Sequence, residues 1–171
     1  QKPADVAVAL QIILLITVLT LAPSLLIMLT SFVRITIAFS FLRRALGTQT
    51  MPPDQILIGL ALFMTVFIMM PVFVEINDTA VQPYLEEELT FREGLDAAAM
   101  PIRNFMLRQV DEKDVALFVR VARMPAPRTP DDLPLHVIVP AFITSELKAA
   151  FIIGFILYIP FLIIDMVIAS V

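Results

Sequence analysis

The sequence predicts an all-α membrane protein in which hydrophobic helical hairpins flank a small helical domain outside the membrane. Two observations on composition support this prediction: hydrophobic residues make up 59% of the 171 positions and charged residues only 16%, and the mean hydropathy is +0.90. Soluble domains are less apolar and more highly charged. The third observation is that apolar runs of about 20 residues or more, long enough to cross a bilayer, lie on both sides of an acidic segment.

The first region, residues 1–76, is expected to form hydrophobic helical hairpins. Residues 6–42 are an apolar run that would measure about 55 Å as one helix at about 1.5 Å per residue, longer than a hydrocarbon core of about 30 Å. We therefore expect a break, and Pro23 is its predicted position because proline lacks the amide donor that a helix interior needs. Residues 55–74 then form the clearest spanning candidate, with about 20 uncharged positions.

The connection between these two apolar runs sets the predicted topology. Arg43 and Arg44 end the first run, and Gly47, Pro52 and Pro53 mark a turn before the next helix. The excess of arginine places this loop in the cytoplasm under the positive-inside rule. The second span would then carry the acidic middle of the chain to the other side of the membrane.

The middle region, residues 77–135, is expected to be a water-facing, extracytoplasmic helical domain that ends in a Pro-rich linker. Residues 75–132 contain 12 acidic and 7 basic side chains, whereas the rest of the chain contains 4 and 5. Thr90 and Glu93 have the spacing of a capping box, which predicts the start of a helix. Residues 124–130 include three prolines and predict an extended linker.

The last region, residues 136–171, is a hydrophobic helical segment. It is too long for one ordinary span, so we expect a bent helix or a helical hairpin. Pro160 is the predicted position of a kink.

Four charged residues stand inside apolar runs and are our candidates for interhelical or intersubunit polar contacts: Arg34, Glu146, Lys148 and Asp165. A charge at the centre of a bilayer costs about 2.5–3.5 kcal/mol, so such side chains normally face protein or water. Glu146 and Lys148 are two positions apart, about 200° around a helix, so we expect them to pair with different neighbours. The alternative is that these charges lie near a membrane boundary and extend to water.

The sequence carries no motif for catalysis, cofactor binding or nucleic-acid binding. It has no Cys, and His136 is its single His, which excludes disulfides, thiolate chemistry and Cys-based zinc sites. The four glycines form no phosphate-binding loop, and no basic patch suits nucleic acid. We expect neither an enzyme nor a bound cofactor.

Four segments carry longer motifs: TSFVRI at 30–35, FLRRALGTQ at 41–49, PAFITSELK at 140–148 and PFLIID at 160–165. In this order, over nearly the whole chain, they resemble the FliP family. The resemblance implies a subunit of the flagellar type III protein export gate, in the bacterial inner membrane at the flagellar basal body and largely on its periplasmic side. It implies that several copies of the chain, five by expectation, assemble with FliQ and FliR around a pore for unfolded flagellar proteins. FlhA and FlhB are further implied partners.

Two departures and three alternatives accompany this resemblance. Ile152 stands where the family pattern has a polar residue, and the family continues beyond residue 171 through a Met-rich stretch that is expected to line the pore constriction. The injectisome gate shares the pattern, although residues 47–49 favour the flagellar form. A secondary transporter or proton channel would use the same charges to bind an ion, but no internal repeat relates the first two spans to the last. The third alternative is a structural anchor whose acidic middle binds a partner.

Overall fold

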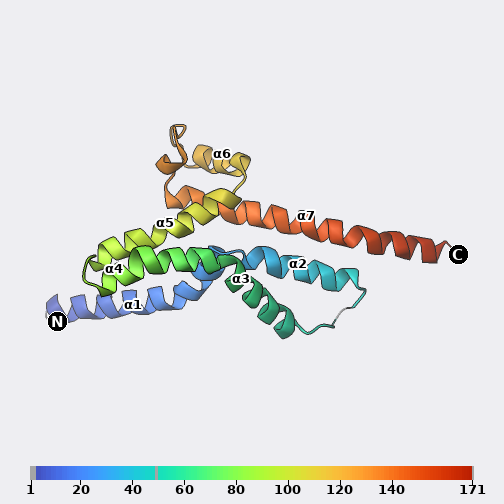
Figure 1. The fold of residues 1–171 in the computed structure, drawn as a ribbon, viewed down its shortest axis with the longest axis horizontal. Coiled ribbons are helices and arrows are strands. Elements are labelled where there is room, and N and C mark those ends of the chain that lie inside the picture. Colours follow the sequence, from blue (N-terminus) through green and yellow to red (C-terminus); the bar gives the residue numbers. More distant parts are fainter. Residues whose placement is uncertain (1–2, 49, 171) are drawn as a thin grey trace.

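The computed structural model describes residues 3–48 and 50–170, and within these ranges the chain is helical and contains no strand (Figure 1). The all-α prediction is confirmed for this part of the chain. In chain order the elements are α1 (Pro3–Met28), α2 (Phe32–Ala45), α3 (Asp54–Ile76), a π-helical segment (Asn77–Val81), α4 (Gln82–Leu85), α5 (Phe91–Gln109), α6 (Glu112–Val121), a 3-10 turn (Pro130–Asp132) and α7 (Leu135–Ala169).

Among the described residues, three helical stretches are long and apolar enough to cross a membrane: Val8–Leu25, Asp54–Leu85 and Leu135–Ala169. The second stretch joins α3 to α4 through the π-helical segment. The first has no buried residue among those whose side-chain exposure the structure describes. These lengths and compositions are consistent with a membrane location.

The break in the first apolar run lies at residues 29–31, so the prediction of a break at Pro23 is wrong. The Thr30 hydroxyl donates to the carbonyl of Ile27 (3.1 Å) and accepts from the amide of Phe32 (3.4 Å). This side chain therefore replaces backbone partners that a continuous helix would supply. Pro23 removes a single amide donor, and α1 continues through it because apolar helices tolerate proline by local adjustment.

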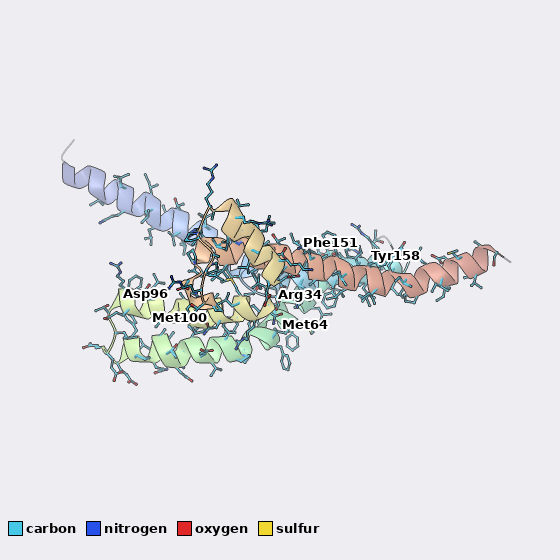
Figure 2. The ribbon with its side chains drawn as sticks, turned by 90° about the horizontal axis from the view of Figure 1, so that it is seen from above. Arg34, Met64, Asp96, Met100, Phe151 and Tyr158 are labelled. Atoms are coloured by element: carbon cyan, nitrogen blue, oxygen red, sulfur yellow. The ribbon has the colours of Figure 1, made fainter. Side chains whose placement is uncertain are left out.

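α7 continues as one helix over 35 residues, so the alternative of a helical hairpin in this region is wrong. Pro140 and Pro160 both lie inside it. In Figure 2 the axis of α7 changes direction beyond Tyr158, close to Pro160, as expected for a proline inside a helix. The last region is therefore a bent helix, which projects beyond the other elements in Figure 1.

The hydrophobic core lies where α3, α5, α6 and the first half of α7 meet. The rings of Phe105 in α5 and Phe142 in α7 pack edge to face, with centroids 5.9 Å apart. This packing fixes α5 and α6 against one end of α7. The other buried apolar residues of the cluster are Met69, Val72, Met106, Val119, Leu133, Val137 and Ile138.

Two side-chain caps define the helices of the acidic middle region. Thr90 and Glu93 form the predicted capping box: the Glu93 carboxylate accepts from the Thr90 amide (2.8 Å), and the Thr90 hydroxyl accepts from the Glu93 amide (3.4 Å). The Thr90 hydroxyl also lies within hydrogen-bonding distance of the Glu93 carboxylate (2.7 Å), and this contact, together with the bond from the Thr90 amide, holds the pKa of Glu93 below its ordinary value. Asp111 caps α6 by accepting from the amide of Lys113 (2.9 Å).

Candidate functional site

Polar groups from four helices, all side chains except the backbone amide of Asp111, meet at one place beside the core. We call this cluster the polar junction, and it consists of Arg34, Gln109, Asp111, Asp114, Ser145, Glu146 and Lys148. The helix α7 contributes the last three, whereas the others come from α2, from the end of α5 and from the start of α6. Buried polar groups in an apolar protein require such partners.

One arm of the junction joins α2 to α7. Arg34 forms an ion pair with Glu146, and its Nη2 also donates to the side-chain oxygen of Gln109 at 3.2 Å. The Glu146 side chain is only 2% exposed, while that of Arg34 is 28% exposed. A carboxylate this deeply buried needs its partner, because an unpaired charge in such a place is strongly destabilising. Figure 2 shows Arg34 where α2 passes α5 and α7.

The other arm joins α6 to α7. The Ser145 hydroxyl accepts from the amide of Asp111 (2.9 Å) and donates to Oδ2 of Asp114 (2.8 Å), and Lys148 forms an ion pair with Asp114. The hydrogen bond from Lys148, aided by the one from Ser145, holds the pKa of Asp114 below its ordinary value, although burial acts in the opposite direction. Asp114 is therefore a buried carboxylate that stays ionised.

The order of residues on α7 explains why it reaches two helices at once. Ser145 and Lys148 are three positions apart and share one face, whereas Glu146 lies about 100° around from Ser145. The first face meets α6 and the second meets α2. Four consecutive residues thus place α7 between two other elements, and the chemistry that they offer is ion pairing and hydrogen bonding.

The α2 arm keeps unused hydrogen-bonding capacity. Oε2 of Glu146, Nε of Arg34 and the hydroxyl of Ser31 are buried and have no hydrogen-bond partner among the residues that the structure describes. Buried polar atoms are nearly always satisfied in folded proteins, by protein groups or by ordered water. This arm can therefore accept a further polar partner.

Just beyond the junction, α2 and α7 approach each other closely. A Cβ atom at Gly154 would overlap the ring of Phe41, and the rings of Phe41 and Phe151 pack edge to face with centroids 5.8 Å apart. A residue larger than glycine would push the helices apart, so Gly154 permits the contact that places Arg34 beside Glu146.

The remaining residues singled out in the sequence lie elsewhere. Asp165 is on the exposed half of α7 and makes no ion pair within the described ranges. Arg43 forms an ion pair with Asp54 at the start of α3. Arg44 borders a groove of about 480 Å³, which is otherwise lined by aromatic residues: Phe41, Phe151, Phe155 and Tyr158.

The sequence analysis did not single out Asp114 or Gln109 as members of the site. A signal for Asp114 does exist: it precedes Phe118 by four positions and therefore shares the apolar face of its helix, where a charge needs a partner. Gln109 is an exposed residue at the end of α5 and carries no such signal. No group of His, Cys, Asp or Glu suited to a metal ion occurs in the described part of the chain.

Comparison with known proteins gives a consistent result. The profile of the FliP family matches residues 15–171. The chain is 52% identical over 161 residues to the flagellar biosynthetic protein FliP of Caulobacter vibrioides, covering 94% of this chain and 60% of that protein. It is 50% identical over 171 residues to FliP of Bacillus subtilis, covering all of this chain and 77% of that protein. For FliP of Aquifex aeolicus the identity is 43% over 165 residues, with coverage of 95% and 69%. The chain thus spans between 60% and 77% of the length of these relatives.

Proposed function

Because this chain belongs to the FliP family, we propose that it is a subunit of the flagellar type III protein export gate in the bacterial inner membrane. In this proposal several copies assemble with FliQ-like and FliR-like subunits around a pore for unfolded flagellar proteins, next to FlhA and FlhB. The observation that carries the proposal is the family match over residues 15–171.

The distribution of exposed apolar side chains supports an assembly subunit. Leu19 in α1 is 71% exposed, and so is Met166 near the end of α7. Apolar surfaces of this extent face lipid or other proteins. The proposed gate supplies both kinds of neighbour.

In this reading the polar junction makes the subunit rigid. Arg34, Glu146 and Lys148 hold α2 and α6 on α7 within one chain, so that each copy presents the same surfaces to its neighbours. Asp165 is available for a contact between subunits, since it stands exposed on an apolar helix. No catalytic step is part of this function.

The proposal includes a topology. Regions 1–76 and 136–171 would be embedded in the membrane or in the assembly, region 77–135 would lie in the periplasm, and the loop after Arg43 and Arg44 in the cytoplasm.

Cysteine labelling tests this topology, because residues 1–171 contain no Cys and a thiol labelled within them is the one introduced. Thr48→Cys should resist a membrane-impermeant maleimide in intact spheroplasts, while Glu87→Cys should react. The reverse pattern would contradict the proposed topology.

The proposed function is tested by native mass spectrometry of the full-length protein, extracted in mild detergent after co-expression with its FliQ-like and FliR-like neighbours. One large complex with several copies of this chain is the expected result. A stable monomer or dimer that does not bind those neighbours would contradict the proposed function. Proton-coupled flux through the isolated chain in liposomes would favour the transporter instead.

A further inference from the structure

We propose that the acidic middle region has two complementary ends, and that one end of each copy docks onto the other end of the next copy. The acidic tip comprises residues 81–96 around the turn between α4 and α5. The basic groove lies between the last turns of α5, α6 and the linker 124–133. This inference rests on the proposed function, in which several copies of the chain assemble.

The acidic tip combines negative charge with exposed apolar side chains. Residues 81–96 contain five acidic side chains and one basic side chain, Arg92. Next to the turn, Leu85 is 66% exposed and Phe91 is 73% exposed. The rings of Phe91 and Tyr84 already pack edge to face, with centroids 6.3 Å apart, so the apolar surface is ordered before any partner binds.

The basic groove has the opposite charge and an apolar floor. Its volume is about 1190 Å³, and Leu107, Val119 and Leu133 are among the residues that line it. Its basic side chains are Arg108, Lys113 and Arg120, and its acidic ones are Glu112 and Asp131. Residues 103–133, which include the linker, contain six basic and five acidic side chains. One of those acids, Asp114, is already paired with Lys148, so a small positive excess remains.

The two ends lie too far apart for one chain to bind itself. They are at opposite ends of α5 (Figure 1), whose 19 residues span about 28 Å. The contact must therefore join different copies, and it is head to tail because the two surfaces differ. A repeated head-to-tail contact forms a closed ring or a helical array.

Charge selects this arrangement over its alternatives. Two acidic tips repel each other, so a contact between like ends is disfavoured, while the basic groove attracts the tip and orients it. Docking would also remove the exposed side chains of Leu85 and Phe91 from water. Burial of apolar surface is the main favourable contribution to the free energy of association. The occupant that fits the groove is therefore a second copy of this chain.

Disulfide crosslinking tests the inference in the full-length protein. In the variant Glu87→Cys with Ala116→Cys, one thiol lies in the acidic tip and the other in the basic groove. The distance along α5 excludes a bond within one chain. Oxidation of membranes that contain the co-expressed gate subunits should give a ladder of crosslinked dimers, trimers and larger species.

The matched control is Glu87→Cys with Gln55→Cys, because Gln55 is also exposed but lies at the start of α3. This pair should give no ladder. A charge swap adds a second test: in the crosslinking variant, Glu86→Lys with Glu88→Lys should lower the yield of the ladder about tenfold, and adding Lys113→Glu with Arg120→Glu should restore it.

Native mass spectrometry of the same samples separates the two proposals. If several copies assemble but residues 87 and 116 form no disulfide, or give only dimers, the docking inference is wrong and the proposed function stands. If no assembly with several copies forms, the proposed function is wrong and the inference fails with it.

Discussion

The two halves of α7 have similarly apolar sequences, but the first half packs against other helices whereas the second half is exposed. All buried residues that the structure describes in α7 lie between Val137 and Gly154, and residues 155–169 include none. The first half holds three polar residues with partners on other helices, whereas the second half holds Asp165, which has no ion pair within the described ranges. Hydropathy therefore does not decide which half is packed inside the chain. The half of α7 that forms hydrogen bonds and ion pairs with other helices is also the half that is buried. The other half is exposed and can contact lipid or other subunits.

The largest expected loss of stability comes from removing one charge from the packed half of α7. Arg34→Ala leaves Glu146 buried without its partner, so it should lower the free energy of unfolding by about 3 kcal/mol, the lower end of the range for buried pairs because Arg34 is partly exposed. Thermal unfolding in detergent, followed by circular dichroism, measures the effect. The double variant Arg34→Met with Glu146→Met should recover most of the loss, because no unpaired charge remains. Unfolding of Arg34→Ala at the original temperature would contradict the role of the junction.

The second arm of the junction should give a smaller effect that depends on pH. Because the pKa of Asp114 is lowered in the folded chain, its stabilisation is fully present above its unfolded pKa of about 3.9 and is lost as pH falls through the lower folded value. Asp114→Asn should cost about 1.5–3 kcal/mol at neutral pH.

The unfolding temperature of both proteins, measured from about pH 7 down to about pH 3, tests this. The unmodified chain should lose more stability than the variant at the acid end. Glu112→Gln, an exposed neighbour, is the control and should follow the unmodified chain. Parallel curves for the unmodified chain and Asp114→Asn would show that Asp114 does not contribute.

The boundary between the two halves can be tested at Gly154. Gly154→Ala places a methyl group against the ring of Phe41 and should cost about 1–3 kcal/mol through overpacking. The matched control is Gly59→Ala in α3, where an added Cβ meets no atom within 4 Å; it should stabilise the helix by about 0.5–1 kcal/mol. Combining Gly154→Ala with Phe41→Leu should relieve the overlap. Equal unfolding temperatures for the two glycine variants would contradict the close approach.

The smallest effect on the fold is expected in the unpacked half. Asp165→Asn should change the stability of the isolated chain by less than about 0.5 kcal/mol, because Asp165 is exposed and makes no ion pair within the described ranges. If Asp165 serves contacts between subunits, the same change should reduce the yield of the multi-copy complex in native mass spectrometry. A large loss of stability in the isolated chain would place Asp165 in the fold rather than in the assembly.

Local signals were sufficient for part of this structure. The capping box of Thr90 and Glu93 starts α5 as predicted, and the uncharged run 55–74 lies within α3. The predicted position of the break in the first apolar run was wrong. The prediction considered only the low helix propensity of Pro23, whereas the break occurs where the hydroxyl of Thr30 competes for backbone groups.

The partners in the polar junction could not be read from local pattern. The angle between Glu146 and Lys148 around a helix indicates two neighbours but does not identify them. Arg34 lies 112 positions from Glu146, and Asp114 lies 34 positions from Lys148. Only the packing of the whole chain brings these residues together. Of the two forms expected for the end of the chain, the bent helix is confirmed and the hairpin is wrong, because a 35-residue helix is excessive only if all of it must cross lipid.

The separation of Arg34 and Glu146 also sets an order of events during biosynthesis. The ribosome adds the 112 positions between them at about 5–20 residues per second, so Arg34 is incorporated roughly 6–22 s before Glu146. During that interval the guanidinium on a nascent apolar helix must be accommodated by the insertion machinery or at the membrane surface. The contact between α2 and α7 can close only after Glu146 has been translated.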